Sequence, residues 1–286
     1  MADAGTSLRQ ALVHTAQLLQ QAGIERARAE ARFLATQALG ISIEAVVGND
    51  ERLLSASERH TLDELAVRRA RREPMSQILG YREFFGRRFT VTADVLTPRP
   101  DSETLIEAVL AHVPDRNASL RVLELGVGSG CLLLTLLAEL PEASGVGVDI
   151  SPAAVSVAHG NAAALGLAER CVLMQNDWSA GIGGIFDLVI SNPPYIPGTE
   201  IAKLEPEVSR YEPRLALDGG EDGLTFYRRL AGDCERLLTS GGLLAVEIGQ
   251  GQCDDVTQLL HDGGLRVLQT RRDLAGIERC IVARKP

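Results

Sequence analysis

The sequence lacks the cysteine and histidine patterns that mark many metal and redox sites. No two cysteines form a C-x-x-C pair, so the sequence indicates neither a disulfide framework nor a zinc site, and we expect no bound metal. The histidines are dispersed and form no Ser-His-Asp or His-Glu-x-x-His pattern. The cysteines are Cys131, Cys171, Cys234, Cys253 and Cys280, and the histidines are His14, His60, His112, His159 and His261.

Long apolar runs and an excess of basic residues are also missing. The sequence has no apolar run of about 18 residues, and its N-terminus has no basic flank followed by an apolar signal core. We therefore expect a cytoplasmic protein without a membrane partner. The formal net charge is -9. Because non-specific nucleic-acid binding depends on Lys and Arg that neutralise phosphates, direct DNA binding is disfavoured.

What the sequence does contain is enough apolar residues for a substantial core. With 286 residues, 45% of them hydrophobic, it predicts two unequal domains. We expect an N-terminal helical bundle at residues 1–83, a short β-hairpin connector at residues 84–104 and a larger α/β domain at residues 105–286. Ser7 and Gln10 are spaced as a helix-capping box at the start of the bundle. The residues that we expect to end its helices are Gly23, Gly40 and Pro74.

Strand-like apolar runs alternate with helical stretches in the larger domain. This alternation predicts a doubly wound, mostly parallel sheet. In such open α/β sheets, ligands bind at the carboxyl ends of the strands. The predicted strands are Arg121–Leu125, Gly145–Ile150, Cys171–Met174, Asp187–Ser191, Gly242–Ile248 and Cys280–Ala283.

A glycine-rich turn follows the first predicted strand. Its G-x-G-x-G pattern lets the backbone turn sharply and approach a ligand closely. A tight turn without a ligand is the alternative interpretation. Cys131 stands where the dinucleotide fingerprint requires Gly or Ala, which disfavours a nicotinamide cofactor. The turn consists of Gly126, Val127, Gly128, Ser129 and Gly130.

Acidic residues near the ends of three strands complete the predicted cofactor site. Asp149 ends the second strand, where a carboxylate can accept hydrogen bonds from both ribose hydroxyls of an adenosine. Glu124 suits the cationic amino-acid tail of S-adenosylmethionine better than a pyrophosphate, which its charge would repel. A carboxylate at a helix N-terminus is the alternative for Glu124. Asp177 could accept from an adenine amino group while Trp178 offers an aromatic face, although a turn acid before a core Trp is an equal alternative.

The fourth predicted strand runs directly into Asn192-Pro193-Pro194-Tyr195. The two prolines remove backbone donors, so the loop presents carbonyl acceptors, and Asn192 adds a side-chain carbonyl. Two acceptors could hold both hydrogens of a planar amide or exocyclic amine, against which Tyr195 offers a flat ring. Such a loop would position and polarise a poorly nucleophilic nitrogen rather than act as a strong base. A rigid turn that caps the strand is the alternative.

These motifs resemble the class I, Rossmann-like S-adenosylmethionine-dependent methyltransferases. Within them the chain is similar to the HemK/PrmC family, which methylates the glutamine N5 of peptide chain release factors. The resemblance implies a seven-stranded sheet, with S-adenosylmethionine bound by residues 126–130, Asp149 and Trp178, and near Asn192. It also implies that the release factor docks on the N-terminal domain and that its Gly-Gly-Gln loop meets residues 192–195. The flanking blocks that carry the resemblance are Gly80–Gly86, Leu96–Glu103, Tyr211–Pro213, Leu217–Gly223 and Asp273–Arg279.

Three other functions stay open at this point. An adenine N6 methyltransferase would use the same loop on a nucleic acid, but the dense basic cluster is more typical of a solvated helix face than of a binding patch. A ribosomal-protein glutamine N5-methyltransferase would differ only in its substrate. A non-catalytic S-adenosylmethionine-binding interaction module is disfavoured by the intact acceptor loop. We also expect the protein to be a monomer. The basic cluster consists of Arg68, Arg69, Arg71 and Arg72.

Overall fold

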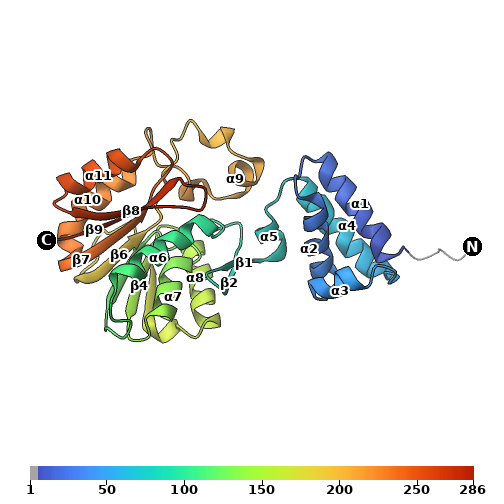
Figure 1. Ribbon diagram of the computed structural model, residues 1–286, viewed down its shortest axis with the longest axis horizontal. Coiled ribbons are helices and arrows are strands. Elements are labelled where there is room, and N and C mark those ends of the chain that lie inside the picture. The colour runs from blue at the N-terminus through green and yellow to red at the C-terminus, as the bar shows by residue number, and fades with distance from the viewer. Residues whose placement is uncertain (1–5) are drawn as a thin grey trace, which may run out of the picture. The chain divides into compact units, whose positions relative to one another are not determined.

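The computed structural model describes residues 6–286, which form two compact units (Figure 1). The first five residues of the predicted N-terminal domain lie outside the described residues. The smaller unit runs to Gly80 and also takes in Glu205–Tyr211, and the larger unit contains Tyr81–Leu204 and Glu212–Pro286. In the described part of the chain, no helix is both long and apolar enough to cross a membrane.

The larger unit is built around a seven-stranded sheet. Its strands are β3 (Arg121–Leu125), β4 (Ser144–Asp149), β5 (Cys171–Gln175), β6 (Phe186–Ser191), β7 (Leu238–Glu247), β8 (Arg266–Arg272) and β9 (Glu278–Arg284). Their order across the sheet is β5-β4-β3-β6-β7-β9-β8. β9 pairs antiparallel with both of its neighbours, and the other neighbouring pairs are parallel. The predicted doubly wound, mostly parallel sheet is therefore confirmed.

Helices cover both faces of this sheet (Figure 1). On one face lie α6 (Glu103–His112), α7 (Cys131–Glu139) and α8 (Pro152–Ala164), and on the other lie α10 (Thr225–Leu237) and α11 (Cys253–Asp262). α7 is buried along its whole middle, as expected for a helix that is apolar on all sides. α10 buries a single stripe with the three- and four-residue spacing of an amphipathic helix. That stripe consists of Tyr227, Leu230, Ala231, Cys234 and Leu237.

A two-stranded hairpin precedes the sheet in the larger unit. Its strands β1 (Tyr81–Phe84) and β2 (Arg87–Thr90) pair antiparallel across the turn Phe85-Gly86. The φ angles of these two turn residues are 49° and 70°, as a two-residue hairpin turn requires. The buried rings of Phe84 and Phe89 lie 6.2 Å apart and pack in the same core as α6 and α7. The hairpin is thereby fixed to the core of the larger unit.

The smaller unit is a helical bundle with its own apolar core. The capping box predicted at its start is confirmed, because Ser7 Oγ accepts from the Gln10 amide and Gln10 Oε1 accepts from the Ser7 amide. Gly40 ends the second helix in the left-handed conformation that glycine tolerates. The helices are α1 (Leu8–Gln21), α2 (Ala27–Leu39), α3 (Ile43–Gly48), α4 (Ala56–Ala70), α5 (Met75–Leu79) and α9 (Pro206–Tyr211).

The arginine cluster at the end of α4 is largely occupied by ion pairs within the smaller unit. Arg69 is buried, and its guanidinium pairs with Glu30 at 2.6 Å and with Glu207 of α9 at 2.8 Å. Arg72 also pairs with Glu207, at 2.8 Å. Breaking a buried pair of this kind typically costs about 3 to 5 kcal/mol, because one charge is left without its partner. The cluster therefore joins α9 to the bundle instead of forming an open basic surface.

Candidate active site

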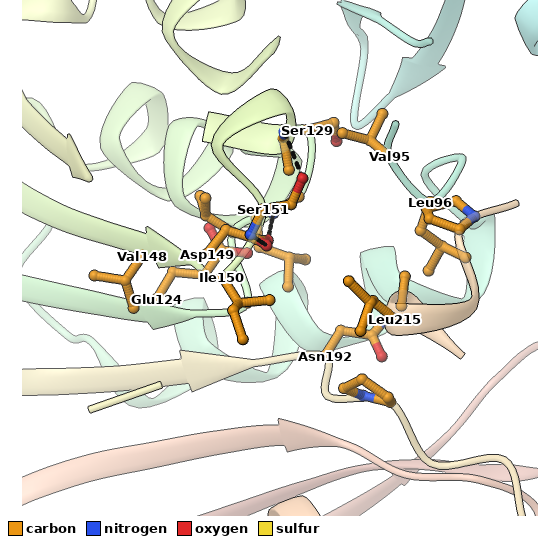
Figure 2. Close-up of a pocket in the computed structure, with 18 of the residues that line it drawn as sticks. Val95, Leu96, Glu124, Ser129, Val148, Asp149, Ile150, Ser151, Asn192 and Leu215 are labelled. Atoms are coloured by element: carbon orange, nitrogen blue, oxygen red, sulfur yellow. Dashed lines mark hydrogen bonds between the residues drawn. The ribbon is translucent and has the colours of Figure 1, made fainter. Parts of the chain in front are cut away.

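A cavity of about 360 Å³ opens at the carboxyl ends of β3, β4, β5 and β6. This volume lies within the range of small-molecule sites. Figure 2 shows Glu124 and Asp149 on one side of the cavity and Asn192 on the other. Gly130, Pro193 and Tyr195 lie outside the lining. The predicted site residues that line the cavity are Glu124, Gly126, Val127, Gly128, Ser129, Asp149, Asp177, Trp178, Asn192 and Pro194.

The glycine-rich turn between β3 and α7 is tied to the end of β4 by Asp149. One carboxylate oxygen of Asp149 accepts from the Gly128 amide and the other from the Ser151 amide, both at 2.9 Å (Figure 2). Gly126 and Gly128 have φ angles of 76° and 51°, and a Cβ atom at either position would meet open space. Because both glycines stand in the left-handed region, larger residues would strain the turn. The turn is thus held in place before any ligand enters.

Glu124 lies buried at the end of β3, on the border of the cavity. Its Oε2 accepts from the Leu133 amide, in the first turn of α7, at 2.9 Å. The alternative interpretation, a carboxylate at a helix N-terminus, therefore describes one of its contacts. Burial raises the pKa of Glu124 well above its ordinary value, and the nearby charge of Asp149 raises it further. A cation entering the cavity would reverse this shift.

Trp178 and Asp177 follow β5, and their side chains lie in different surroundings. Trp178 is buried, and its ring lies 5.1 Å from that of Phe226 of α10. Within the described residues, its indole Nε1 is buried without a hydrogen-bond partner. Asp177 is largely exposed and pairs with Arg229 at 3.0 Å. Phe226 and Arg229 also line the cavity, and neither has a local signal in the sequence because both belong to an amphipathic helix.

Asn192 stands at the start of a hydrogen-bonded chain that leads away from the cavity. Its Nδ2 donates to Ser102 Oγ at 3.3 Å, and Ser102 Oγ donates to Glu247 Oε2 at 2.5 Å. The Tyr195 hydroxyl donates to the other oxygen of Glu247 at 3.5 Å. Burial raises the pKa of Glu247 to about 7. Neither Ser102 nor Glu247 was among the predicted site residues, although Ser102 lies in a flanking block and Glu247 ends a buried strand.

The loop after β6 is clamped by the segment Leu217–Gly223. Backbone hydrogen bonds join the Ile196 amide to the Leu217 carbonyl at 3.0 Å and the Gly219 amide to the Ile196 carbonyl at 2.8 Å. A Cβ atom at Gly223, whose φ is 77°, would lie 2.3 Å from the Tyr195 carbonyl oxygen. Only glycine permits this close approach. The acceptor loop is therefore a rigid part of the site.

Two family models match this chain. The PrmC N-terminal domain matches residues 10–80, and the methyltransferase small domain matches residues 101–207. Among solved structures, the hMettl16 catalytic domain in complex with the MAT2A 3′UTR hairpin 6 has a TM-score of 0.59 at 17% identity. The match covers 77% of this chain and 81% of that chain. It supports the methyltransferase fold alone.

Full-length relatives extend the match over nearly the whole chain. The release factor glutamine methyltransferase of Rhodospirillum rubrum is 51% identical over 267 residues, which cover 93% of this chain and 82% of the relative. That of Caulobacter vibrioides is 46% identical over 268 residues, covering 93% of this chain and 92% of the relative. The resemblance inferred from the motifs is confirmed, and the chain belongs to the release factor glutamine methyltransferase family.

Proposed function

We propose that this enzyme transfers a methyl group from S-adenosylmethionine to the side-chain amide nitrogen, N5, of the glutamine in the Gly-Gly-Gln loop of release factors. One observation carries the proposal: Asn192 borders the same cavity as the glycine-rich turn and Asp149. The Nδ2 of Asn192 is taken by Ser102, so its Oδ1 is the atom that serves as an acceptor. A site for an adenosine-containing cofactor and an acceptor for a planar amide thus meet in one space.

The charged groups that line the cavity suit S-adenosylmethionine. Glu124, Asp149 and Asp177 bring carboxylates to its border, which suits a cation with ribose hydroxyls and would repel a pyrophosphate. When bound, the cofactor supplies a methyl group carried on a positively charged sulfur. Asp149 would accept from the ribose, and Trp178 would border the adenine. Residues 126–130 would pass close to the amino-acid tail beside Glu124.

The chain's own residues would act on the substrate amide by holding it. An amide nitrogen is a weak nucleophile because its lone pair is delocalised into the carbonyl group. Asn192 Oδ1 and the Pro193 carbonyl would each accept one of its two hydrogens and orient the nitrogen toward the cofactor side. Pro194 has no backbone N–H to compete for these acceptors. Tyr195 completes the substrate-binding loop, and its hydroxyl bonds to Glu247 instead of facing the cavity.

The smaller unit would dock the intact release factor. A groove of about 390 Å³ lies between α1, α2 and α3, and we name it the α1–α3 groove. Two exposed arginines of α2, Arg28 and Arg32, stand at this groove, and no ion pair within residues 6–286 involves either. The groove thus combines apolar contact area with positive charge. Its lining residues are Arg9, Leu12, Val13, Ala16, Gln17, Gln20, Arg28, Arg32, Val46, Val47 and Asp50.

Mass spectrometry of release factors after incubation with the enzyme and isotope-labelled cofactor tests the proposal. We expect one added methyl group on the glutamine of the Gly-Gly-Gln loop. Parallel incubations contain ribosomal proteins and adenine-containing RNA or DNA, which are the substrates of the competing functions. Label on adenine or on a ribosomal-protein glutamine, with none on the release factor, would contradict the proposal. Cofactor binding without transfer in a single turnover would point to a non-catalytic module.

A further inference from the structure

Two buried residues are linked to Asn192 by consecutive hydrogen bonds. Ser102 and Glu247 are each 2% exposed, and only Ser102 also borders the cavity. We propose that Glu247 and Ser102 are positioning residues that fix which end of the Asn192 carboxamide faces the substrate. This inference rests on the proposed function, in which Asn192 accepts a hydrogen from the glutamine amide. Glu247 would thus control the reaction without touching the substrate.

The direction of each hydrogen bond follows from the number of protons available. A charged Glu247 carboxylate has no proton and can only accept, so the single hydroxyl proton of Ser102 points toward it. The lone pairs of Ser102 Oγ then face Asn192 and accept from its Nδ2. The Tyr195 hydroxyl donates to the second carboxylate oxygen, which reinforces the same arrangement. The carboxamide of Asn192 is thereby held with Oδ1 available to the substrate.

A neutral Glu247 would permit the opposite arrangement. Its carboxylic acid proton can be donated to Ser102 Oγ, and the Ser102 hydroxyl is then free to donate to Asn192. A carboxamide that accepts from Ser102 must turn its oxygen inward and its NH2 group toward the cavity. That NH2 group would face the NH2 group of the substrate glutamine, and two donors cannot bond to each other. The charged form of Glu247 is therefore the active form.

The surroundings of Glu247 set the pH at which this switch occurs. Burial favours the neutral form and is the largest influence, raising the pKa to about 7. Hydrogen bonds from Ser102 and Asn192 and the charge of Arg279 oppose this shift, while Asp101 adds to it. Methyl transfer should thus rise as the pH is raised through about 7. The other titratable groups that act on Glu247, or on which it acts, are Tyr195 after β6, Tyr227 of α10, Cys131 of α7 and Cys280 of β9.

The test compares full-length wild type with Glu247→Gln in single-turnover methylation of a release factor, from pH 5.5 to 9 in steps of about half a unit around the Glu247 pKa. Gln keeps the size of the side chain but neither carries charge nor titrates. We expect the variant to be about 10- to 100-fold slower above pH 8, because a misdirected group in a site costs this much. Below pH 6 the two rates should converge, since wild-type Glu247 is then neutral as well. Calorimetry should give both proteins the same cofactor Kd.

Four further variants make the test decisive. Ser102→Ala should reduce the rate above pH 8 by a similar factor, and the double variant should be no slower than the slower single one, because both act through one chain. Glu247→Asp should keep a pH-dependent rate. Glu124→Gln tests the competing source of a pH-dependent rate, because Glu124 is also a buried carboxylate with a raised pKa. It should weaken cofactor binding and leave the rise near pH 7 intact.

Two results would overturn the positioning role. One is a Glu247→Gln enzyme with wild-type rate and pH profile, and the other is loss of the pH-dependent rise in Glu124→Gln but not in Glu247→Gln. Both results can be interpreted only if the wild-type enzyme methylates the release factor glutamine. If the wild type itself adds no methyl group there, the proposed function has failed instead, so the two failures are distinguished.

Discussion

The two sides of the cavity are built in different ways. The side with the glycine-rich turn comes from short contiguous segments, in which Asp149 accepts from the backbone amides of Gly128 and Ser151. The substrate side is assembled from distant parts of the chain, since Asn192 is 90 residues from Ser102, and Ser102 is 145 residues from Glu247. A ligand common to many enzymes can be held by a local motif. Orienting one amide requires side chains that only the tertiary structure brings together.

The two sides also use buried carboxylates differently. Glu124 accepts from a backbone amide of α7, so its surroundings are fixed by secondary structure. Glu247 accepts from two side-chain hydroxyls, whose protons can reorient when its charge changes. Burial raises the pKa of both carboxyl groups. Of the two, only Glu247 can therefore pass a change of charge to the substrate.

Replacing Asn192 should have the largest effect and should act on the substrate side alone. In Asn192→Ala we expect the methyl-transfer step to slow by about 100- to 1000-fold, as when one preorganised polar contact is removed from an active site. Cofactor affinity should stay close to wild type, because the glycine-rich turn and Asp149 are untouched. Single-turnover kinetics and calorimetric titration measure the two quantities. Asn117→Ala, in an exposed turn, is the matched control. An undiminished transfer rate would show that Asn192 does not hold the substrate amide.

Replacing Asp149 should give the reverse pattern, with a smaller effect. Asp149→Ala removes the proposed acceptor for the ribose and releases the Gly128 and Ser151 amides. Hydrogen bonds to a charged group contribute about 1.5 to 3 kcal/mol, so the cofactor Kd should rise about 10- to 100-fold. At saturating cofactor the transfer rate should recover most of its wild-type value. If the Kd is unchanged while transfer is lost, the division between the two sides is wrong.

The sequence predicted the fold and the grouping of residues 126–129 and Asp149 at one cavity, because both depend on local patterns. Apolar runs of strand length lie in β3, β4, β5, β6, β7 and β9, and the glycine spacing marked the turn after β3. β8 was missing from the predicted strands. Arg266–Arg272 carries three arginines and is only partly buried at the edge of the sheet, so it has no apolar run to detect.

The relations that escaped prediction are those between distant segments. Glu207 follows the acceptor loop in the chain, yet it belongs to the smaller unit through Arg69. The flanking blocks were recognised as typical of the family, but their contacts were not predictable. Glu212 of one block binds Arg99 of another, and Arg279 of a third block pairs with Asp101 at 3.8 Å. Pairing partners for such charges become visible only once the fold brings the segments together.

Charge reversal at the α1–α3 groove extends the comparison to the smaller unit, which contributes none of the residues that line the cavity. In the double variant Arg28→Glu/Arg32→Glu we expect the KM for an intact release factor to rise about tenfold, because rim charges mainly affect association. The kcat and the methylation of a short glutamine peptide should not change. Arg116→Glu, in an exposed turn of the larger unit, is the matched control. Equal KM values for the double variant and the wild type would exclude this groove as the docking surface.

The smallest expected effect concerns stability and follows from the charge on the substrate side. Burial raises the Glu247 pKa from 4.5 to about 7, so the folded protein retains a proton that the unfolded chain has released between these values. The contribution is fully present below pH 4.5 and is lost as the pH rises through about 7. Glu247→Gln has no such dependence.

Compared with this variant, the wild type should therefore lose stability between pH 5 and 8 by up to about 3 kcal/mol, which is on the order of several degrees in Tm. Thermal unfolding of both proteins across this range measures the difference. A constant difference in Tm would mean that Glu247 is already charged at pH 5, in which case the switch described for Asn192 could not operate near neutral pH. A growing difference would show that the acceptor orientation needed for transfer is maintained at the expense of folding stability.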